Sequence, residues 1–498
     1  MRARTLESLV RPALAALLGI ALLCGPAPAP AAEATDAAPA APVLAAATAV
    51  ATAAAFASPA EGAAVNPAAL PDSLPPVEKH FWRASGEIFA TNLLVWGYDR
   101  YIREGGTNPG FRIGFNSWAE NLTNGFEWDD NSFSTNQFAH PYHGSLYFNA
   151  ARANGYDYWE SMPFTFAGSF MWEYFGEVHH PSMNDWIATS VGGIALGEVL
   201  YKFSDLILDN TATGGSRRWK ELAGFAVNPV RGFNRLVTGE ASRVGPNPPG
   251  KHPDYLSSMV RFGVRSISEQ RLGVADTAGV FADLAFTYGN PFSGRAKAPF
   301  DHFTFGLELD SKEKSTLARA NAMGLLYGGS LRETAETHHY LGAFQYYDYF
   351  NNRAFEFGGQ SVGAGLLSKF DTGEKMRFLT ALHVTALLVG GTSSDYVSFS
   401  GREYDYGPGV GFRLHAGFER GGWNLLGVGT QQFWIYPLNG NVGHHVVSMT
   451  AVRAQFPVRR ELAVGLDYTL YLADRYYSDY PDVHERYPIV RGFLSAKL

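Results

Sequence analysis

The chain contains a single cysteine, Cys24, among its 498 residues. It closes an apolar run that follows three arginines and precedes the small residues of PAPAPAAEA, a pattern typical of a secretory signal peptide over residues 1–32. Because Leu23 stands where lipoprotein processing requires a small residue, cleavage near Ala31 or Ala32 is favoured over a lipid anchor. The exported chain would then hold no cysteine, which excludes disulfides and thiolate chemistry.

Charge is also scarce. Charged residues make up 17% of the chain, and the formal net charge is -7. Lysine and arginine are scattered rather than clustered, so we expect no nucleic-acid partner. Past the signal peptide, apolar stretches such as WIATSVGGIALG end before the ~20 residues that a membrane-spanning helix needs. An inner-membrane anchor is therefore disfavoured.

Composition and periodicity divide the chain. Residues 33–78 are rich in alanine and proline and hold few large apolar side chains, so we expect a disordered linker. Apolar residues then recur at helical spacing over 79–245 and alternate with period two over 250–498. The fold class predicted is α+β, with a helical domain followed by a transmembrane antiparallel β-barrel.

The second half has the alternation of a membrane barrel. In ELAVGLDYTLYLA, apolar residues from Leu462 to Leu472 share one face, and Glu461, Asp467 and Thr469 share the other. Segments of about ten residues with one apolar and one polar face are typical of barrel strands, and about twelve occur, an even number as in bacterial barrels. A soluble β-sandwich is the alternative. The signal peptide, the strand length and the 14% aromatic content favour the barrel.

Polar residues on the inner faces should meet in the lumen. We expect them to neutralise one another in networks rather than to form a catalytic or selectivity site. These residues are His302, Glu308, Asp310, Arg413, His415 and Asp467.

Connections between the segments alternate in length. Short ones such as ERGG and PVRRE alternate with longer ones such as YPLNGNVG, which assigns the short turns to the periplasm and the long loops to the outside. Both ends of an even-stranded barrel then lie in the periplasm, so the helical domain is expected there. Because such a lumen is too narrow for several helices, they should dock below the barrel or against the membrane surface.

One segment of the helical domain, residues 140–180, is dense in histidine, glutamate and aromatic residues. A proline near its start and an Asn-Gly pair at its middle predict one helix. Asp157 or Ser161 can begin a second helix that runs to about Glu177. The segment is therefore expected to form a helical hairpin.

This hairpin carries residue types suited to metal binding or proton transfer. Glu173 and Glu177 are one turn apart and could ligate a metal or share a proton. The catalytic candidates are His140, His143, Glu173, Glu177 and Asp185, and the metal candidates are His143, Glu173, Glu177 and His179. We expect no cofactor other than a divalent metal at this site.

A packed polar interface is the competing interpretation. The spacing matches no established metal pattern such as H-E-x-x-H. Both glutamates would instead be buried between helices and neutralised by Arg152, Arg231 or backbone N–H groups. The Asn-Asp pair before the third helix would act as its N-cap. We favour this interpretation, and with it a non-enzymatic role.

Four motifs follow one another along the helical half: H-P-Y-x-G-S, W-E-x-x-G-E, P-S-x-N-D and G-G-I-A-L-G-E, with NPVRGFNRLVTGE after them. This order resembles the bacterial family called domain of unknown function 3943, closely over residues 140–240 and loosely over the barrel half. The resemblance implies an exported, outer-membrane protein of Gram-negative bacteria. It implies no activity.

These patterns predict an outer-membrane protein that serves envelope structure or the passage or handling of lipid or small solutes. Its expected partners are outer-membrane lipids and the barrel assembly machinery, which would read the last strand. The alternative is an envelope enzyme, a lipid or lipopolysaccharide hydrolase, that uses the histidine and carboxylate candidates. A third hypothesis is adhesion through the tyrosine-rich loops.

Overall fold

The computed structural model describes most of the chain from residue 78 on. The described residues are 78–128, 131–248, 251–267, 277–294, 298–311, 315–352, 356–373, 376–397 and 402–498, without the side chains of residues 104 and 105. The predicted signal peptide and nearly all of the predicted linker lie outside them.

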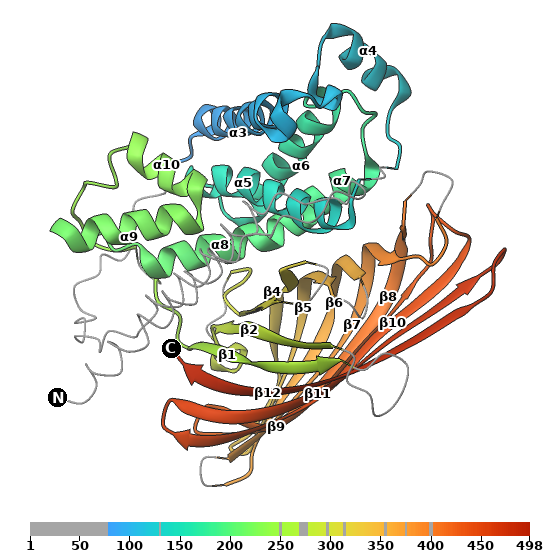
Figure 1. The fold of residues 1–498 in the computed structure, drawn as a ribbon. Coiled ribbons are helices and arrows are strands. Elements are labelled where there is room, and N and C mark those ends of the chain that lie inside the picture. The colour runs from blue at the N-terminus through green and yellow to red at the C-terminus, as the bar shows by residue number, and fades with distance from the viewer. Residues whose placement is uncertain are drawn as a thin grey trace. The chain divides into compact units, whose positions relative to one another are not determined.

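Helices occupy the described chain up to residue 237 (Figure 1). The longer ones are α3 (Phe81–Tyr101), α4 (Phe115–Asn124), α5 (His140–Ala153), α6 (Tyr158–Phe175), α7 (Met183–Ile187), α8 (Gly193–Ile207), α9 (Gly214–Val227) and α10 (Pro229–Val237). Short turns are η2 (Arg103–Gly106), η3 (Pro109–Phe111) and the π-helical η4 (Thr135–Ala139) and η5 (Ala188–Gly192). None of the described helices combines the length and apolarity needed to cross a bilayer.

Within the described residues, twelve strands form a closed antiparallel barrel in which β1 pairs with β12. The strands are β1 (Leu256–Ile267), β2 (Thr277–Tyr288), β3 (Phe303–Asp310), β4 (Leu317–Glu333), β5 (Thr337–Asn351), β6 (Glu356–Asp371), β7 (Met376–Ser393), β8 (Tyr404–Arg420), β9 (Trp423–Ile435), β10 (Gly443–Arg459), β11 (Leu462–Tyr477) and β12 (Val483–Lys497). This confirms the predicted fold class of a helical part followed by an antiparallel barrel of about twelve strands.

The two faces of the barrel wall differ as the alternation predicts. Along β11, Leu466 and Tyr468 are exposed on the outside, whereas Asp467 between them is buried in the lumen. On β9 to β12 the large exposed apolar residues of the outer face lie mainly in the strand halves next to the short turns. They include Leu426, Val428, Val452, Phe456, Val464, Leu466, Val490 and Leu494.

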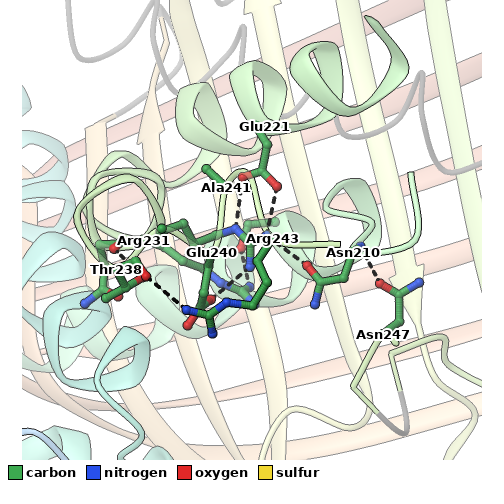
Figure 2. Close-up of polar contacts among 12 residues, drawn as sticks. Asn210, Glu221, Arg231, Thr238, Glu240, Ala241, Arg243 and Asn247 are labelled. Atoms are coloured by element: carbon green, nitrogen blue, oxygen red, sulfur yellow. Dashed lines mark hydrogen bonds and ion pairs between the residues drawn. The ribbon is translucent and has the colours of Figure 1, made fainter. Parts of the chain in front are cut away.

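The described chain falls into two compact units, one formed by Lys79–Val199 with His252–Lys497 and one that includes Leu200–Lys251. In the smaller unit, Arg217 donates to the backbone carbonyls of Asp209, Glu240 and Ala241. Arg235 forms a two-point ion pair with Glu221. Figure 2 shows the polar contacts around these groups. Arg217 and Arg235 thus stabilise this unit through bonds to backbone carbonyls and to Glu221.

The hairpin of α5 and α6 forms as predicted, and its boundaries have local causes. Asp157 caps α6, because its side chain accepts from the Glu160 N–H while Glu160 accepts from the Asp157 N–H. The Asn-Gly pair ends α5, with Gly155 in the left-handed region at φ 90°. The third helix is capped by Ser182, which accepts from the Asp185 N–H, so the predicted Asn-Asp cap is wrong by two residues.

Glycine lets α5 approach the segment that follows α7. A Cβ on Gly144 would lie 1.8 Å from the Thr189 carbonyl oxygen, and one on Gly193 would lie 2.6 Å from the Gly144 Cα. No side chain fits in that space. The close approach sets the distance between His140 on α5 and Asp185 on α7.

The helical residues up to Val199 pack on the outer wall of the barrel. The Tyr347 hydroxyl donates to the Gln137 carbonyl at 2.8 Å, and Gln137 Nε2 donates to the Tyr406 hydroxyl at 3.2 Å. Successive side chains of a strand point to opposite faces. Asp348 bonds Arg413 in the lumen, so Tyr347 beside it points outward. The helices thus lie against the outer wall of the barrel, whereas docking below the barrel or against the membrane surface was predicted.

Candidate cation site in the helical segment

Three buried side chains from three helices converge in the helical segment. His140 begins α5, Glu173 lies in the last turn of α6, and Asp185 lies in α7, and one ligand atom from each lies within 4.8 Å of the other two. The exposed fractions are 9% for His140, 0% for Glu173 and 1% for Asp185. One imidazole and two carboxylates form a donor set that suits a divalent transition metal.

The spacing of the donor atoms is close to that of a coordination sphere. His140 Nε2 lies 3.6 Å from Asp185 Oδ2. Two ligands of a tetrahedral metal with bonds of about 2.1 Å are about 3.4 Å apart. The His140–Asp185 pair is therefore near ligand spacing, and the Glu173 donor lies within 4.8 Å of both.

Neighbouring groups orient all three side chains. His140 Nδ1 lies 3.2 Å from the Thr189 hydroxyl, and its Nε2 lies 3.6 Å from Asp185 Oδ2. Glu173 Oε2 accepts from the Ser182 N–H at 2.9 Å. Asp185 Oδ1 accepts from the Asn184 side-chain amide at 2.8 Å. Such second contacts are typical of metal ligands, whose other atoms are held by hydrogen bonds.

Two π-helical turns flank this centre. η4 ends directly before His140, and η5 begins three residues after Asp185 and contains Thr189. The wider turn of a π-helix changes which way the following side chains point, and such turns recur at functional sites. Sequence reasoning missed these turns and Thr189, and it assigned Asn184 to a helix cap rather than to the support of Asp185.

His143 does not join the three residues, although it is one turn from His140. Its Nε2 lies 2.9 Å from the Tyr147 hydroxyl, and its ring packs edge-on against Trp172. Burial, aided by the charge of His140, lowers the pKa of His143 to about 3. The ring is therefore neutral at physiological pH and belongs to the packing around the centre.

Glu177 and His179 also lie outside this group of three residues. α6 ends at Phe175 with Gly176 as its C-cap, so Glu177 is past the helix and does not share the face of Glu173. The Glu177 backbone carbonyl accepts from the Asn121 side-chain amide. His179 is exposed. Of the four predicted metal ligands, the structure therefore groups Glu173 alone with His140 and Asp185.

The contacts of Glu173 partly support the alternative prediction, a packed polar interface between helices. The Ser182 backbone N–H does bond Glu173, as a polar interface requires. Arg152, however, forms a two-point ion pair with Glu198, and Arg231 bonds Ser204 and Asp205. These two arginines have carboxylate partners other than the predicted glutamates.

The polar lumen residues form ion pairs, as expected. Arg265 and Asp310 are fully buried and 2.5 Å apart, Arg491 bonds Glu308 at 2.9 Å, and Arg413 bonds Asp348 at 2.5 Å. Asp467 likewise pairs with Arg453 at 2.9 Å. His302 instead contacts the Gly289 carbonyl, and His415 is exposed.

An apolar layer accompanies these charges among the lumen-facing residues. Its residues come from eight strands and pack into one cluster: Ile267, Phe350, Phe357, Leu387, Phe433, Ile435, Val447, Tyr471 and Ile489. Phe357 stacks on Phe433 at 4.6 Å between ring centres. The cluster thus brings apolar side chains of eight strands together among the described lumen-facing residues.

Residues 125–230 match the family described as Domain of unknown function (DUF3943). The matched part is named the DUF3943 domain after this similarity. It contains all three residues of the buried group and both π-helical turns. The family resemblance seen in the sequence is thereby confirmed, and no sequence among curated proteins matches the chain.

Solved structures similar to this chain include channels, at low identity. The NanC porin is 11% identical, and the match covers 48% of this chain and 100% of that chain at a TM-score of 0.27. The CymD monoaromatic hydrocarbon channel is 8% identical, with 50% and 90% covered at 0.21. The outer membrane channel DcaP of Acinetobacter baumannii is 8% identical, with 49% and 96% covered at 0.21. Because these scores are low, the barrel beside the DUF3943 domain is assigned from its own strand pairing.

Proposed function

We propose that this chain is an outer-membrane barrel protein whose barrel anchors the DUF3943 domain and does not conduct solutes. The observation that carries the proposal is a closed antiparallel barrel with apolar residues outside and neutralised charges inside. Lipid outside and polar packing inside is the pattern of such barrels. The apolar layer around Phe357 and Phe433 supports a scaffold role over passage through the lumen.

Membrane fractionation and heat-dependent gel mobility test the anchoring. The protein should sediment with outer membranes and migrate faster before boiling than after it. In planar bilayers the parent should show no steady conductance. A Phe357→Ala, Phe433→Ala double variant should show a higher conductance than the parent. A fully soluble protein would end the proposal, and a conducting parent would end the scaffold role.

A second function is supported by the buried group of His140, Glu173 and Asp185. We infer that it holds a divalent cation, which can polarise a bound water or an ester oxygen. The reaction class that fits is hydrolysis of an envelope molecule such as a lipid or lipopolysaccharide. Asp185, Glu173 and His140 would be its ligands, and Thr189 would orient the imidazole.

Metal analysis of the purified protein tests this centre. After dialysis against zinc or manganese, the parent should retain about one ion per chain by elemental mass spectrometry, since three buried ligands bind tightly. Glu173→Gln and Asp185→Asn should each lose it. Glu177→Gln is the matched control, because Glu177 is past the end of α6 and should leave metal content unchanged. If the parent binds no metal and lower stability is the only effect of Glu173→Gln, the group is a packed polar interface.

A further inference from the structure

Helix α3 is built with its polarity reversed. Its exposed residues include Trp82, Phe89 and Leu93, with 84%, 59% and 51% of their surface accessible. Its buried residues include Glu87, Thr91, Asn92 and Asp99. A helix on the surface of a water-soluble domain turns its apolar stripe toward the core and its polar face to solvent. α3 does the opposite along most of its length, although Ala84 and Ile88 are buried as well.

Helix α6 repeats this arrangement. Trp159 and Phe170 are exposed, and the aromatic and methionine residues between them are half-exposed or exposed on the same side. The buried face carries Ser161, Thr165, Ser169 and Glu173. Two helices of one unit thus share an apolar exterior and a polar interior.

The buried polar groups of α3 join it to its neighbours by hydrogen bonds. Asn92 donates to the Gly168 carbonyl of α6 at 3.2 Å, and Glu87 accepts from the Asn154 amide at 2.8 Å. The Tyr147 hydroxyl donates to Asn92. Small residues and interhelical hydrogen bonds hold helices together where lipid removes the hydrophobic drive for association. The contacts of α3 with its neighbours are of this kind.

The barrel identifies what covers the apolar faces. The unit that contains α3 and α6 packs on the outer wall through Tyr347 and Tyr406. Elsewhere that wall exposes apolar residues such as Leu466, which the proposed function places against acyl chains. The apolar faces of α3 and α6 therefore belong to the same compact unit as a wall that exposes the same chemistry.

We propose that the outward faces of α3 and α6 contact the acyl chains of membrane lipids alongside the barrel. Phe89, Leu93 and Phe170 would lie in the apolar layer, and the tryptophans at the two helix starts, Trp82 and Trp159, would lie near its polar boundary, where indole rings are favoured. The proposal rests on insertion of the barrel in the membrane. It adds a lipid-facing helical surface that the barrel alone does not require.

Spin labels on single cysteines test the proposal in the full chain. After replacement of Cys24 by alanine, labels are placed at Phe89→Cys and Leu93→Cys, at Leu466→Cys on the barrel wall, and at Ala335→Cys in the exposed β4–β5 turn. The protein is reconstituted in vesicles of phosphatidylethanolamine and phosphatidylglycerol. Collision with oxygen, which enters the acyl layer, is compared with collision with a water-soluble nickel chelate.

Labels at Phe89 and Leu93 should resemble Leu466, with high oxygen and low nickel accessibility, and differ from Ala335. Nickel accessibility equal to that of Ala335 would overturn the lipid contact while Leu466 still supports the inserted barrel. Low accessibility to both reagents would also overturn it, because another protein surface or a second copy then covers the helix. Nickel access at Leu466 itself would overturn the barrel proposal and this one together.

Discussion

The barrel and the DUF3943 domain both bury polar groups, but they neutralise them differently. In the barrel, Asp310 and Asp348 each meet an arginine at 2.5 Å. In the helical domain, Glu173 and Asp185 gather around His140, and their hydrogen-bond donors include the neutral Ser182 N–H and Asn184 amide. Carboxylates paired with arginine are already satisfied and serve the fold. Carboxylates arranged around an imidazole keep donor atoms turned toward a common point, which is what a cation site requires.

Removing an arginine from the lumen should give the largest effect. Arg413→Ala leaves Asp348 buried without its ion pair, and loss of one partner of such a pair costs about 3–5 kcal/mol. The midpoint of guanidinium unfolding in detergent micelles should fall accordingly. Metal content should stay at the parent level, since the cation centre is in the helical domain.

A double variant separates charge from packing at this pair. Arg413→Met with Asp348→Leu removes both charges and keeps apolar volume, so most of the lost stability should return. If Arg413→Ala is as stable as the parent, the lumen charges do not support the barrel, and the contrast between the two interiors fails.

A methyl group on Gly144 should disturb the helical domain alone. Its Cβ would lie 1.8 Å from the Thr189 carbonyl, so α5 must shift away from η5, at a cost of about 1–3 kcal/mol. Gly144→Ala should lose bound metal and be cut faster by protease within the domain, while the barrel keeps its heat-dependent mobility. Gly86→Ala on α3 is the control, because its Cβ would meet nothing within 4 Å. Unchanged protease resistance in Gly144→Ala would contradict the close approach.

Acid should weaken the helical domain through His143. The pKa of His143 is lowered to about 3 by burial, so on unfolding the ring takes up a proton at any pH between about 6.5 and 3. Its contribution to stability is complete above pH 6.5 and falls by about 1.4 kcal/mol per pH unit below it. His143→Gln should flatten this slope in tryptophan-monitored unfolding between pH 7 and 5. An equal slope in both proteins would assign the acid sensitivity to other groups.

The sequence predicted the barrel better than the site, for a physical reason. Period-two alternation with the charges of Glu308, Arg413 and Asp467 inside follows directly from strand geometry. The site depends on how three helices pack, and helical spacing on one element cannot show it. Glu173 and Glu177 were paired because they are one turn apart, yet α6 ends between them at Phe175. The order of the motifs held the better signal, since each of the first three contributes one member of the buried group.

The helical domain and the short turns should be accessible from opposite sides of the membrane. The helical domain and the short turns were both predicted to be periplasmic. In the structure, Trp128 of the helical domain packs on Tyr406, at the end of β8 next to a longer connection, whereas Ala335 lies in the short β4–β5 turn. With the short turns periplasmic, a membrane-impermeant maleimide should label Glu127→Cys in intact cells and Ala335→Cys after permeabilisation. Labelling in the reverse order would place the helices in the periplasm and the short turns outside. Labelling of both Glu127→Cys and Ala335→Cys from the same side would contradict the contact between Trp128 and Tyr406. That contact and the β4–β5 turn belong to opposite ends of the strands.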